Sequence, residues 1–131
     1  MTIDLAMLLA SVAIYFVLTW IPAIRTAMEH GPFKLLGNRD AIPVYTGKQA
    51  RPEKAAANMA ENLLMFAPLV LIAHVAGLND DLTARGAQIF VIARLAHAIC
   101  YLMGAPVLRS IAYIGGLIGM VMIATRLIGA L

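Results

Sequence analysis

The most constraining feature of the sequence is an uncharged stretch that covers residues 5–24. Asp4 precedes it and Arg25 follows it, so the stretch is 20 residues long. As an α-helix it would measure about 30 Å, which matches the hydrocarbon thickness of a bilayer. The stretch is longer than the apolar region of a typical signal peptide, and no basic segment comes before it. We therefore predict a retained transmembrane helix here.

The composition extends this prediction to the whole chain. Hydrophobic residues make up 62% of the chain, charged residues make up 13%, and the mean hydropathy is +0.85. Soluble domains contain about 45–50% apolar and about 25% charged residues. Glycine, proline and polar turn signals separate the apolar segments. We predict one all-α integral membrane domain over residues 1–131, with transmembrane helices at about 3–27, 52–78, 82–103 and 107–129 and a loop at about 28–51.

The basic residues are concentrated where this arrangement predicts one side of the membrane. Cytoplasmic loops of membrane proteins carry an excess of lysine and arginine. The loop is therefore expected in the cytoplasm, with both termini away from it. Seven of the ten basic residues belong to this group: Arg25, Lys34, Arg39, Lys48, Arg51, Lys54 and Arg109.

Several classes of site lack support in the sequence. Cys100 is the only cysteine, so no intramolecular disulfide can form. His30, His74 and His97 are scattered, without the spacing of a metal-ligand set. We find neither a phosphate-binding glycine loop nor a nucleophile elbow. We expect neither a metal nor a nucleic-acid partner.

Polar residues recur on one face of each of the last three predicted helices. Residues three and four apart share a helix face, so each set is expected to point in one direction. A charge at the bilayer centre costs about 2.5–3.5 kcal/mol on insertion scales, so each set needs an explanation. Glu61 and Arg94 are predicted at similar depth and are expected to share a neutralising network. The alternative is that these residues only hold the helices together. The sets are Lys54, Asn58 and Glu61; Arg94, His97 and Tyr101; and Arg109, Ser110 and Tyr113.

Three stretches of the chain resemble the signatures of a known family. They are ANMAENL at residues 57–63, ARLAHAICY at residues 93–101, and GAPVLRS at residues 104–110 followed by Tyr113. They resemble, in order and spacing, the second, third and fourth helices of the MAPEG family, the membrane-associated proteins in eicosanoid and glutathione metabolism. The resemblance spans nearly the whole chain and is strongest to the bacterial branch.

The resemblance implies a homotrimer of four-helix subunits that binds glutathione between neighbouring subunits on the cytoplasmic side. It implies a structural role for Arg94. Where some members carry two arginines just before the asparagine, this chain has Lys54 and Ala57. The implied catalytic residues are Arg109, Ser110 and Tyr113, and the implied glutathione contacts are Lys54, Asn58, Glu61, His97, Tyr101, Arg109 and Tyr113.

The expected function is that of a glutathione-dependent transferase or peroxidase in the bacterial inner membrane. Its substrate would be a lipophilic electrophile or a lipid hydroperoxide, reached from the surrounding lipids. Arg109 is expected to stabilise the glutathione thiolate, with Ser110 or Tyr113 as hydrogen-bond donor. The alternative is a non-catalytic protein that binds a phospholipid or another anion in the same pocket. A transporter or channel is less favoured, because no pair of broken helices is evident.

Overall fold

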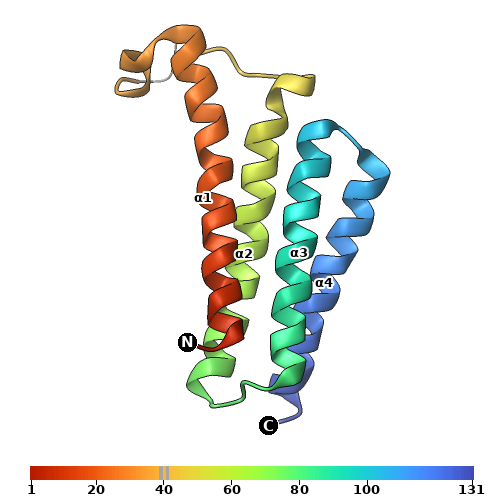
Figure 1. Ribbon diagram of the computed structural model, residues 1–131. Helices are drawn as coiled ribbons and strands as arrows, with labels where there is room; N and C mark the ends of the chain where they lie inside the picture. The colour runs from red at the N-terminus through yellow and green to blue at the C-terminus, as the bar shows by residue number, and fades with distance from the viewer. Residues whose placement is uncertain (39, 41) are drawn as a thin grey trace.

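The computed structural model describes residues 1–38, 40 and 42–131. Four long helices follow one another: α1 (Ile3–His30), α2 (Arg51–Val75), α3 (Asp81–Met103) and α4 (Pro106–Ile128). They lie side by side in one bundle, with both termini at one end and the α1–α2 connection at the other (Figure 1). Arg39, counted above among the basic residues, and Ala41 lie outside the described residues.

All four helices are long and apolar enough to cross a membrane. Only 11–39% of the residues in their most apolar windows are buried inside the chain, so most apolar side chains face outward. A soluble protein would not expose so much apolar surface, whereas lipid or neighbouring subunits can cover it. The predicted all-α bundle of four membrane-spanning helices is confirmed.

The helix ends follow local backbone chemistry and differ from the predicted ranges by up to three residues. α1 continues to His30 and stops where Gly31 adopts a φ of 87°. α2 stops at Val75 rather than at residue 78, because the chain turns at Gly77, whose φ is 66°. The predicted loop at 28–51 contains the last turn of α1 and two short 3₁₀ helices, η1 (Pro32–Leu35) and η3 (Gly47–Ala50).

The core has two parts along the bundle axis. At the end that carries the termini, the rings of Phe66 and Phe90 stack with centroids 3.8 Å apart, and Ile123 of α4 packs with them. Toward the α1–α2 connection, Leu18 of α1 packs against small residues of α2 and α3. The second cluster therefore lets α1, α2 and α3 approach closely at the level of Asn58 and His97.

Glycines set the close approach of α3 and α4. A Cβ added at Gly119 would lie 2.5 Å from the carbonyl oxygen of Gly86 and 2.8 Å from the backbone nitrogen of Phe90. A Cβ added at Gly115 would lie 3.3 Å from Ala93. Side chains at the two positions in α4 would hold the helices apart, so this pair of helices packs through its backbones.

Polar contacts close the end of the bundle that carries the termini. Asp80 caps α3 by accepting hydrogen bonds from the backbone N–H groups of Leu82 and Thr83, at 3.0 and 3.2 Å. Its carboxylate also pairs with Arg126 near the end of α4. Asn79 donates a hydrogen bond of 2.5 Å to Asp4 of α1. The α2–α3 turn thereby joins the first and last helices.

Candidate functional site

The polar faces of α2, α3 and α4 converge around a cavity of about 360 Å³, which we call the Asn58 cavity. It lies in the half of the bundle that carries the α1–α2 connection, where α3 ends and α4 begins (Figure 1). The structure thus brings six of the predicted site residues together. Its lining residues are Asn58, His97, Tyr101, Arg109, Ser110, Tyr113 and Ile114.

The start of α4 positions three of these side chains. The φ of 79° at Gly104 ends α3, and Pro106 occupies the first turn of α4, where its missing N–H is not needed. Arg109 and Tyr113 then lie one turn apart on the face turned to α3. The Arg109 guanidinium stands 4.7 Å over the ring of Tyr101. Ser110 donates a hydrogen bond of 3.0 Å to the carbonyl of Pro106, so its oxygen meets the cavity as an acceptor.

Arg94 lies beneath the cavity and is only 1% exposed. Its Nη1 donates a hydrogen bond of 3.1 Å to Oδ1 of Asn58, and its guanidinium stands 5.3 Å from the ring of Tyr113. A Cβ at Gly116 would come within 3.1 Å of its Nε, so the glycine makes room for it. Arg94 therefore holds two cavity residues, on α2 and α4, in place.

The predicted pairing of Glu61 with Arg94 is wrong for the described chain. Asn58, one turn before Glu61, accepts the hydrogen bond from Arg94, while Glu61 is exposed on the outer face of α2. Among the described residues, the Nε and Nη2 of Arg94 have no hydrogen-bond partner. The charge of Arg94 is thus buried without an anion beside it, and this adds to the positive potential of the cavity.

The bond to Arg94 also fixes which way Asn58 points. A guanidinium can only donate, so the amide oxygen must face Arg94 and the amide nitrogen is left to donate elsewhere. The backbone carbonyl of Asn58 accepts a further hydrogen bond of 2.8 Å from Asn62. Asn58 and Arg109 therefore both present donors to the cavity, which favours a ligand rich in carbonyl, carboxylate or thiolate acceptors.

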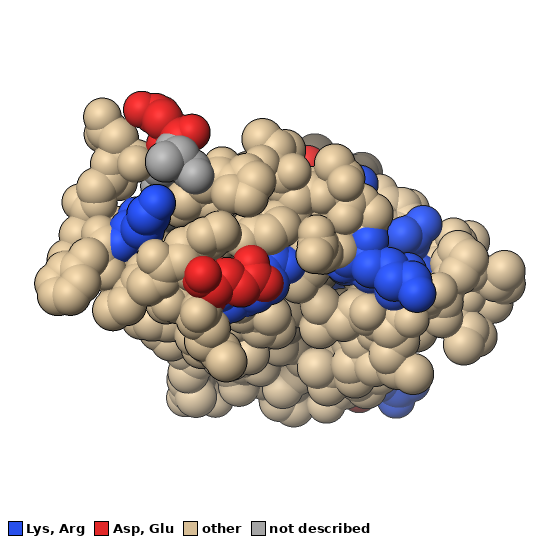
Figure 2. Space-filling model, turned by 90° about the horizontal axis from the view of Figure 1, so that it is seen from above, with Lys and Arg blue, Asp and Glu red and all other residues tan. Residues whose placement is uncertain are grey.

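A second hollow of about 380 Å³ adjoins the first and shares Tyr101 and Arg109 with it. We call it the basic cavity, since four cationic side chains line it. Lysine and arginine side chains gather at this end of the molecule (Figure 2). No acidic residue lines either hollow within the part of the chain that the structure describes. The lining of the basic cavity is Gly47, Lys48, Arg51, Lys54, Tyr101, Gly104, Pro106 and Arg109.

The two arginines nearest the basic cavity differ in their partners. Arg25 of α1 is engaged: it donates to the carbonyl of Gln49, pairs with Glu53 and stands 3.9 Å over the ring of Tyr45. Arg51 instead lies against the end of α3, where a Cβ at Gly104 would collide with its guanidinium. Arg51, together with Arg109, therefore lines the cavity, whereas Arg25 does not.

Two of the predicted glutathione contacts, Lys54 and Glu61, do not line the Asn58 cavity. Lys54 lines the basic cavity rather than the Asn58 cavity. Glu61 lines neither of them among the described residues. Six lining residues of the two cavities were not among the predicted site residues: Gly47, Lys48, Arg51, Gly104, Pro106 and Ile114. Arg51 had a usable signal, because it precedes Lys54 by one turn of the same helix.

The described residues show no group of three or more histidine, cysteine, aspartate or glutamate side chains that could hold a metal ion. The arrangement is instead suited to an organic anion. Asn58 and Arg109 present donors, the charges of the lining are positive, and aromatic rings from α3 and α4 form its walls.

Comparison with known proteins agrees with the fold. The family model described as MAPEG family matches residues 5–129. No curated protein matches the chain significantly, and neither does any solved structure. The match covers all four helices and both cavities. The chain is therefore an integral membrane protein of the MAPEG family.

Proposed function

We propose that this protein is a membrane-bound glutathione-dependent transferase or peroxidase, acting on lipophilic electrophiles or lipid hydroperoxides. The observation that carries the proposal is the convergence of donors from α2, α3 and α4 on the Asn58 cavity, beside a second cavity lined by cations. Glutathione carries a thiol, two carboxylates and peptide carbonyls, and this is the acceptor-rich chemistry that such a lining suits.

Arg109 supplies the activation step in this proposal. A free thiol has a pKa of about 8.5, so little of it is thiolate at neutral pH. Lowering that pKa by about two requires about 2.7 kcal/mol of preferential stabilisation of the thiolate. A guanidinium together with one hydroxyl donor can supply this at a partly desolvated site. Tyr113 is the better donor, because the hydroxyl hydrogen of Ser110 is already bonded to the carbonyl of Pro106.

The thiolate can then react in two ways. With an electrophilic carbon it forms a C–S bond and expels a leaving group, or it adds to a double bond that later takes up a proton. With a hydroperoxide it attacks the O–O bond, which gives an alcohol and a sulfenic acid. A second glutathione converts the sulfenic acid to a disulfide and water. Both routes need only the thiol and a substrate supplied from the lipid phase.

The basic cavity would hold the carboxylate end of glutathione. Lys48, Arg51 and Lys54 surround it, and Arg51 offers the forked donor geometry that a carboxylate accepts best. This arrangement compensates for the lysine and alanine that stand where some relatives have two arginines.

Calorimetric titration of the detergent-purified protein with glutathione tests the proposal. We expect saturable binding that weakens by about tenfold or more in Arg109→Ala, since a charge-assisted contact contributes about 1.5–3 kcal/mol. Lys34→Ala is the matched control, because Lys34 is an exposed cation of η1 outside both cavities. A wild-type protein that does not bind glutathione, and has no glutathione-dependent turnover, would refute the proposal.

The exposed cations of the basic cavity favour one competing function. Phosphate-bearing headgroups of an anionic leaflet would suit Lys48, Arg51 and Lys54 equally well. The protein would then be a non-catalytic binder of phospholipid. Mass spectrometry of co-purified lipids distinguishes the two, because a tightly held phospholipid that glutathione cannot displace favours the lipid-binding function.

We also propose that the protein assembles as a homotrimer in the bacterial inner membrane. The family resemblance suggests the trimer, and the exposed Glu61 on the apolar outer face of α2 supports burial of that face against another subunit. A carboxylate facing lipid tails would be costly, whereas an adjacent subunit or its bound ligand can supply donors. Native mass spectrometry from detergent should give a mass of three chains, and a monomer alone would contradict this assembly.

A further inference from the structure

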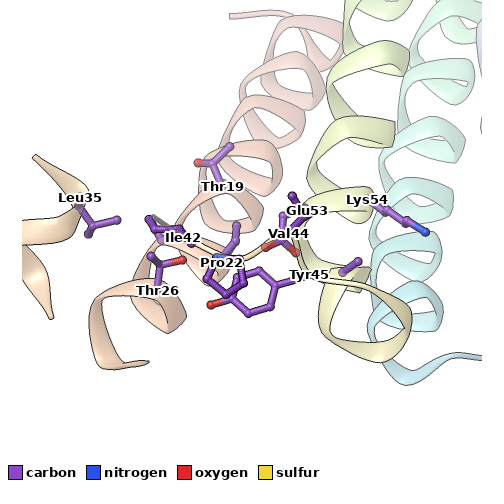
Figure 3. Close-up of a pocket in the computed structure, with 12 residues that line it drawn as sticks. Thr19, Pro22, Thr26, Leu35, Ile42, Val44, Tyr45, Glu53 and Lys54 are labelled. Atoms are coloured by element: carbon purple, nitrogen blue, oxygen red, sulfur yellow. The ribbon is translucent and has the colours of Figure 1, made fainter. Parts of the chain in front are cut away.

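A further cavity lies away from the Asn58 cavity and has a volume of about 570 Å³. It is partly open and is bordered by the second half of α1, the chain segment 42–45 and the start of α2 (Figure 3). This volume falls within the range of about 300–1,000 Å³ that is typical of small-molecule sites. We call it the α1–α2 cavity. Its lining residues are Thr19, Pro22, Ala23, Thr26, Leu35, Ile42, Pro43, Val44, Tyr45, Ala50, Glu53 and Lys54.

The walls of the α1–α2 cavity are mainly apolar. Pro22 and Ala23 of α1 line it, as do Pro43 and Val44 of the segment 42–45. The hydroxyl of Thr19 is already bonded to the carbonyl of Phe16 at 2.7 Å. A ligand here would therefore gain most of its affinity from burial of apolar surface.

Two ionisable side chains that line this cavity, Tyr45 and Glu53, have partners within the chain. Glu53 is paired with Arg25, and Arg25 covers the ring of Tyr45. The Tyr45 hydroxyl donates a hydrogen bond of 2.5 Å to Glu29, and that bond raises the pKa of Tyr45, so the phenol stays neutral. His30 lies 3.1 Å from the same hydroxyl. The charge of Glu53 is thus compensated by Arg25, although its Oε2 has no hydrogen-bond partner among the described residues.

Lys54 forms the boundary between this cavity and the basic cavity, since it lines both. Its carbon chain borders the α1–α2 cavity, and its ammonium group points away, toward α3 (Figure 3). The two neighbouring hollows therefore present opposite environments. One offers several cations without adjacent acids, and the other offers apolar walls with compensated charges.

We infer that the α1–α2 cavity is a binding site for an uncharged, lipophilic small molecule that enters from the membrane. A charged ligand would be desolvated there against mainly apolar walls, beside a carboxylate that is already paired with Arg25, which is unfavourable. A complete phospholipid is excluded by its charged headgroup and its size. Apolar side chains of the same connection, Phe33, Leu36 and Val44, are exposed, as expected for a segment in contact with lipid. The site does not depend on the proposed thiol chemistry.

Photolabelling of the full-length protein in detergent tests this inference with two matched probes. Benzophenone is uncharged and lipophilic, and 4-benzoylbenzoate is the same molecule with a carboxylate. We expect benzophenone to label residues 19–26 and 42–45 saturably, with competition by uncharged naphthalenemethanol. We expect the carboxylate probe to label the lining of the basic cavity instead, and each probe to favour its own site by about tenfold.

Two variants locate the site, each with a matched control. Val44→Glu places a charge at the cavity wall on an exposed position and should reduce benzophenone labelling several-fold. Val75→Glu adds the same charge at an exposed position at the far end of α2 and should leave it unchanged. Ala23→Phe fills the cavity and should abolish labelling there, whereas Val12→Phe, on the exposed side of α1, should not.

Three labelling results would contradict the proposed site. Labelling that rises linearly with probe concentration and spreads over the exposed residues of α1 would mean that benzophenone reports only the lipid-facing surface. Equal labelling of residues 19–26 and 42–45 by both probes, or full labelling in Val44→Glu, would also overturn the inference.

Discussion

Arg94 shows how a residue can be unfavourable for stability and still be suited to a site. It is almost wholly buried, it donates to Asn58, and its Nε and Nη2 find no acceptor among the described residues. Buried charged groups replaced by apolar ones of similar volume often leave stability unchanged or higher. The identifiable benefit of Arg94 is that it orients the Asn58 amide and lies against Tyr113.

We therefore predict that Arg94→Met keeps or raises the thermal unfolding midpoint while it weakens glutathione binding by about tenfold, the value of one hydrogen-bonded charged contact. Differential scanning fluorimetry and calorimetry on the same preparation measure the two quantities. A large fall in the midpoint with unchanged affinity would assign Arg94 a purely structural role.

A second residue-scale prediction concerns Asp80 outside the membrane. The hydrogen bond from Arg126, and then those from the backbone of the α3 first turn, hold the pKa of Asp80 below its usual value of 3.8. Because the folded state binds this proton less readily than the unfolded chain, ionised Asp80 favours folding above that value. The contribution is lost as the pH falls through the lowered pKa.

Asp80→Asn keeps a good helix cap but removes the charge. We expect it to lower the unfolding midpoint at neutral pH, and the difference from wild type to shrink as the pH falls below about 4. Thermal unfolding midpoints of the wild type and of Asp80→Asn, measured from neutral pH down through this acidic range, test the prediction. A difference that stays constant down to the lowest pH would show that the charge of Asp80 contributes nothing to stability.

At the scale of elements, α3 and α4 form a pair whose separation is set by Gly86 and Gly119. A methyl group at Gly119 would meet backbone atoms, which cannot move aside as a side chain can. We predict that Gly119→Ala lowers the free energy of unfolding by about 1–3 kcal/mol, the usual cost of overpacking. Gly37→Ala is the control, because a Cβ there meets nothing within 4 Å. Equal stability of the two variants would contradict the backbone-packing account.

The four helices could be predicted from the sequence because their signals are long and cumulative. The run at residues 5–24 and the later apolar segments each contain enough residues to outweigh local exceptions. Three polar faces on three helices also predicted convergence, and six of those residues do line one cavity.

What could not be predicted depends on short-range competition between side chains. Spacing and depth along the helices predicted that Glu61 and Arg94 meet. In the structure Asn58, one turn before Glu61 on α2, accepts the hydrogen bond from Arg94 instead. Likewise, the role of Gly104 requires knowledge that the end of α3 faces Arg51 across the bundle. Patterns along one helix indicate which face is polar, but they do not specify which atoms meet across helices.

For the whole molecule, the charge distribution predicts one orientation. Cations gather at the end that carries the α1–α2 connection, while both termini lie at the other end (Figures 1 and 2). We expect the connection in the cytoplasm and the termini outside it.

Single cysteines in a Cys100→Ser background test this orientation. Lys48→Cys should resist a membrane-impermeant maleimide in intact spheroplasts and react after lysis, whereas Leu131→Cys should react in both. The reverse pattern would show the opposite orientation.

The contact between Arg51 and the end of α3 has a consequence for how ligand binding depends on ionic strength. Helix C-termini carry a partial negative charge, so the guanidinium at Gly104 already rests beside an electrostatic partner. Capture of a carboxylate by Arg51 would then be an exchange of one partner for another, not the gain of a new one. Added salt screens both the contact that is lost and the contact that is formed. The affinity for an anion should therefore fall less steeply with salt concentration than the number of cations around the basic cavity implies. Arg51→Ala should change this salt dependence of the affinity less than Lys48→Ala does.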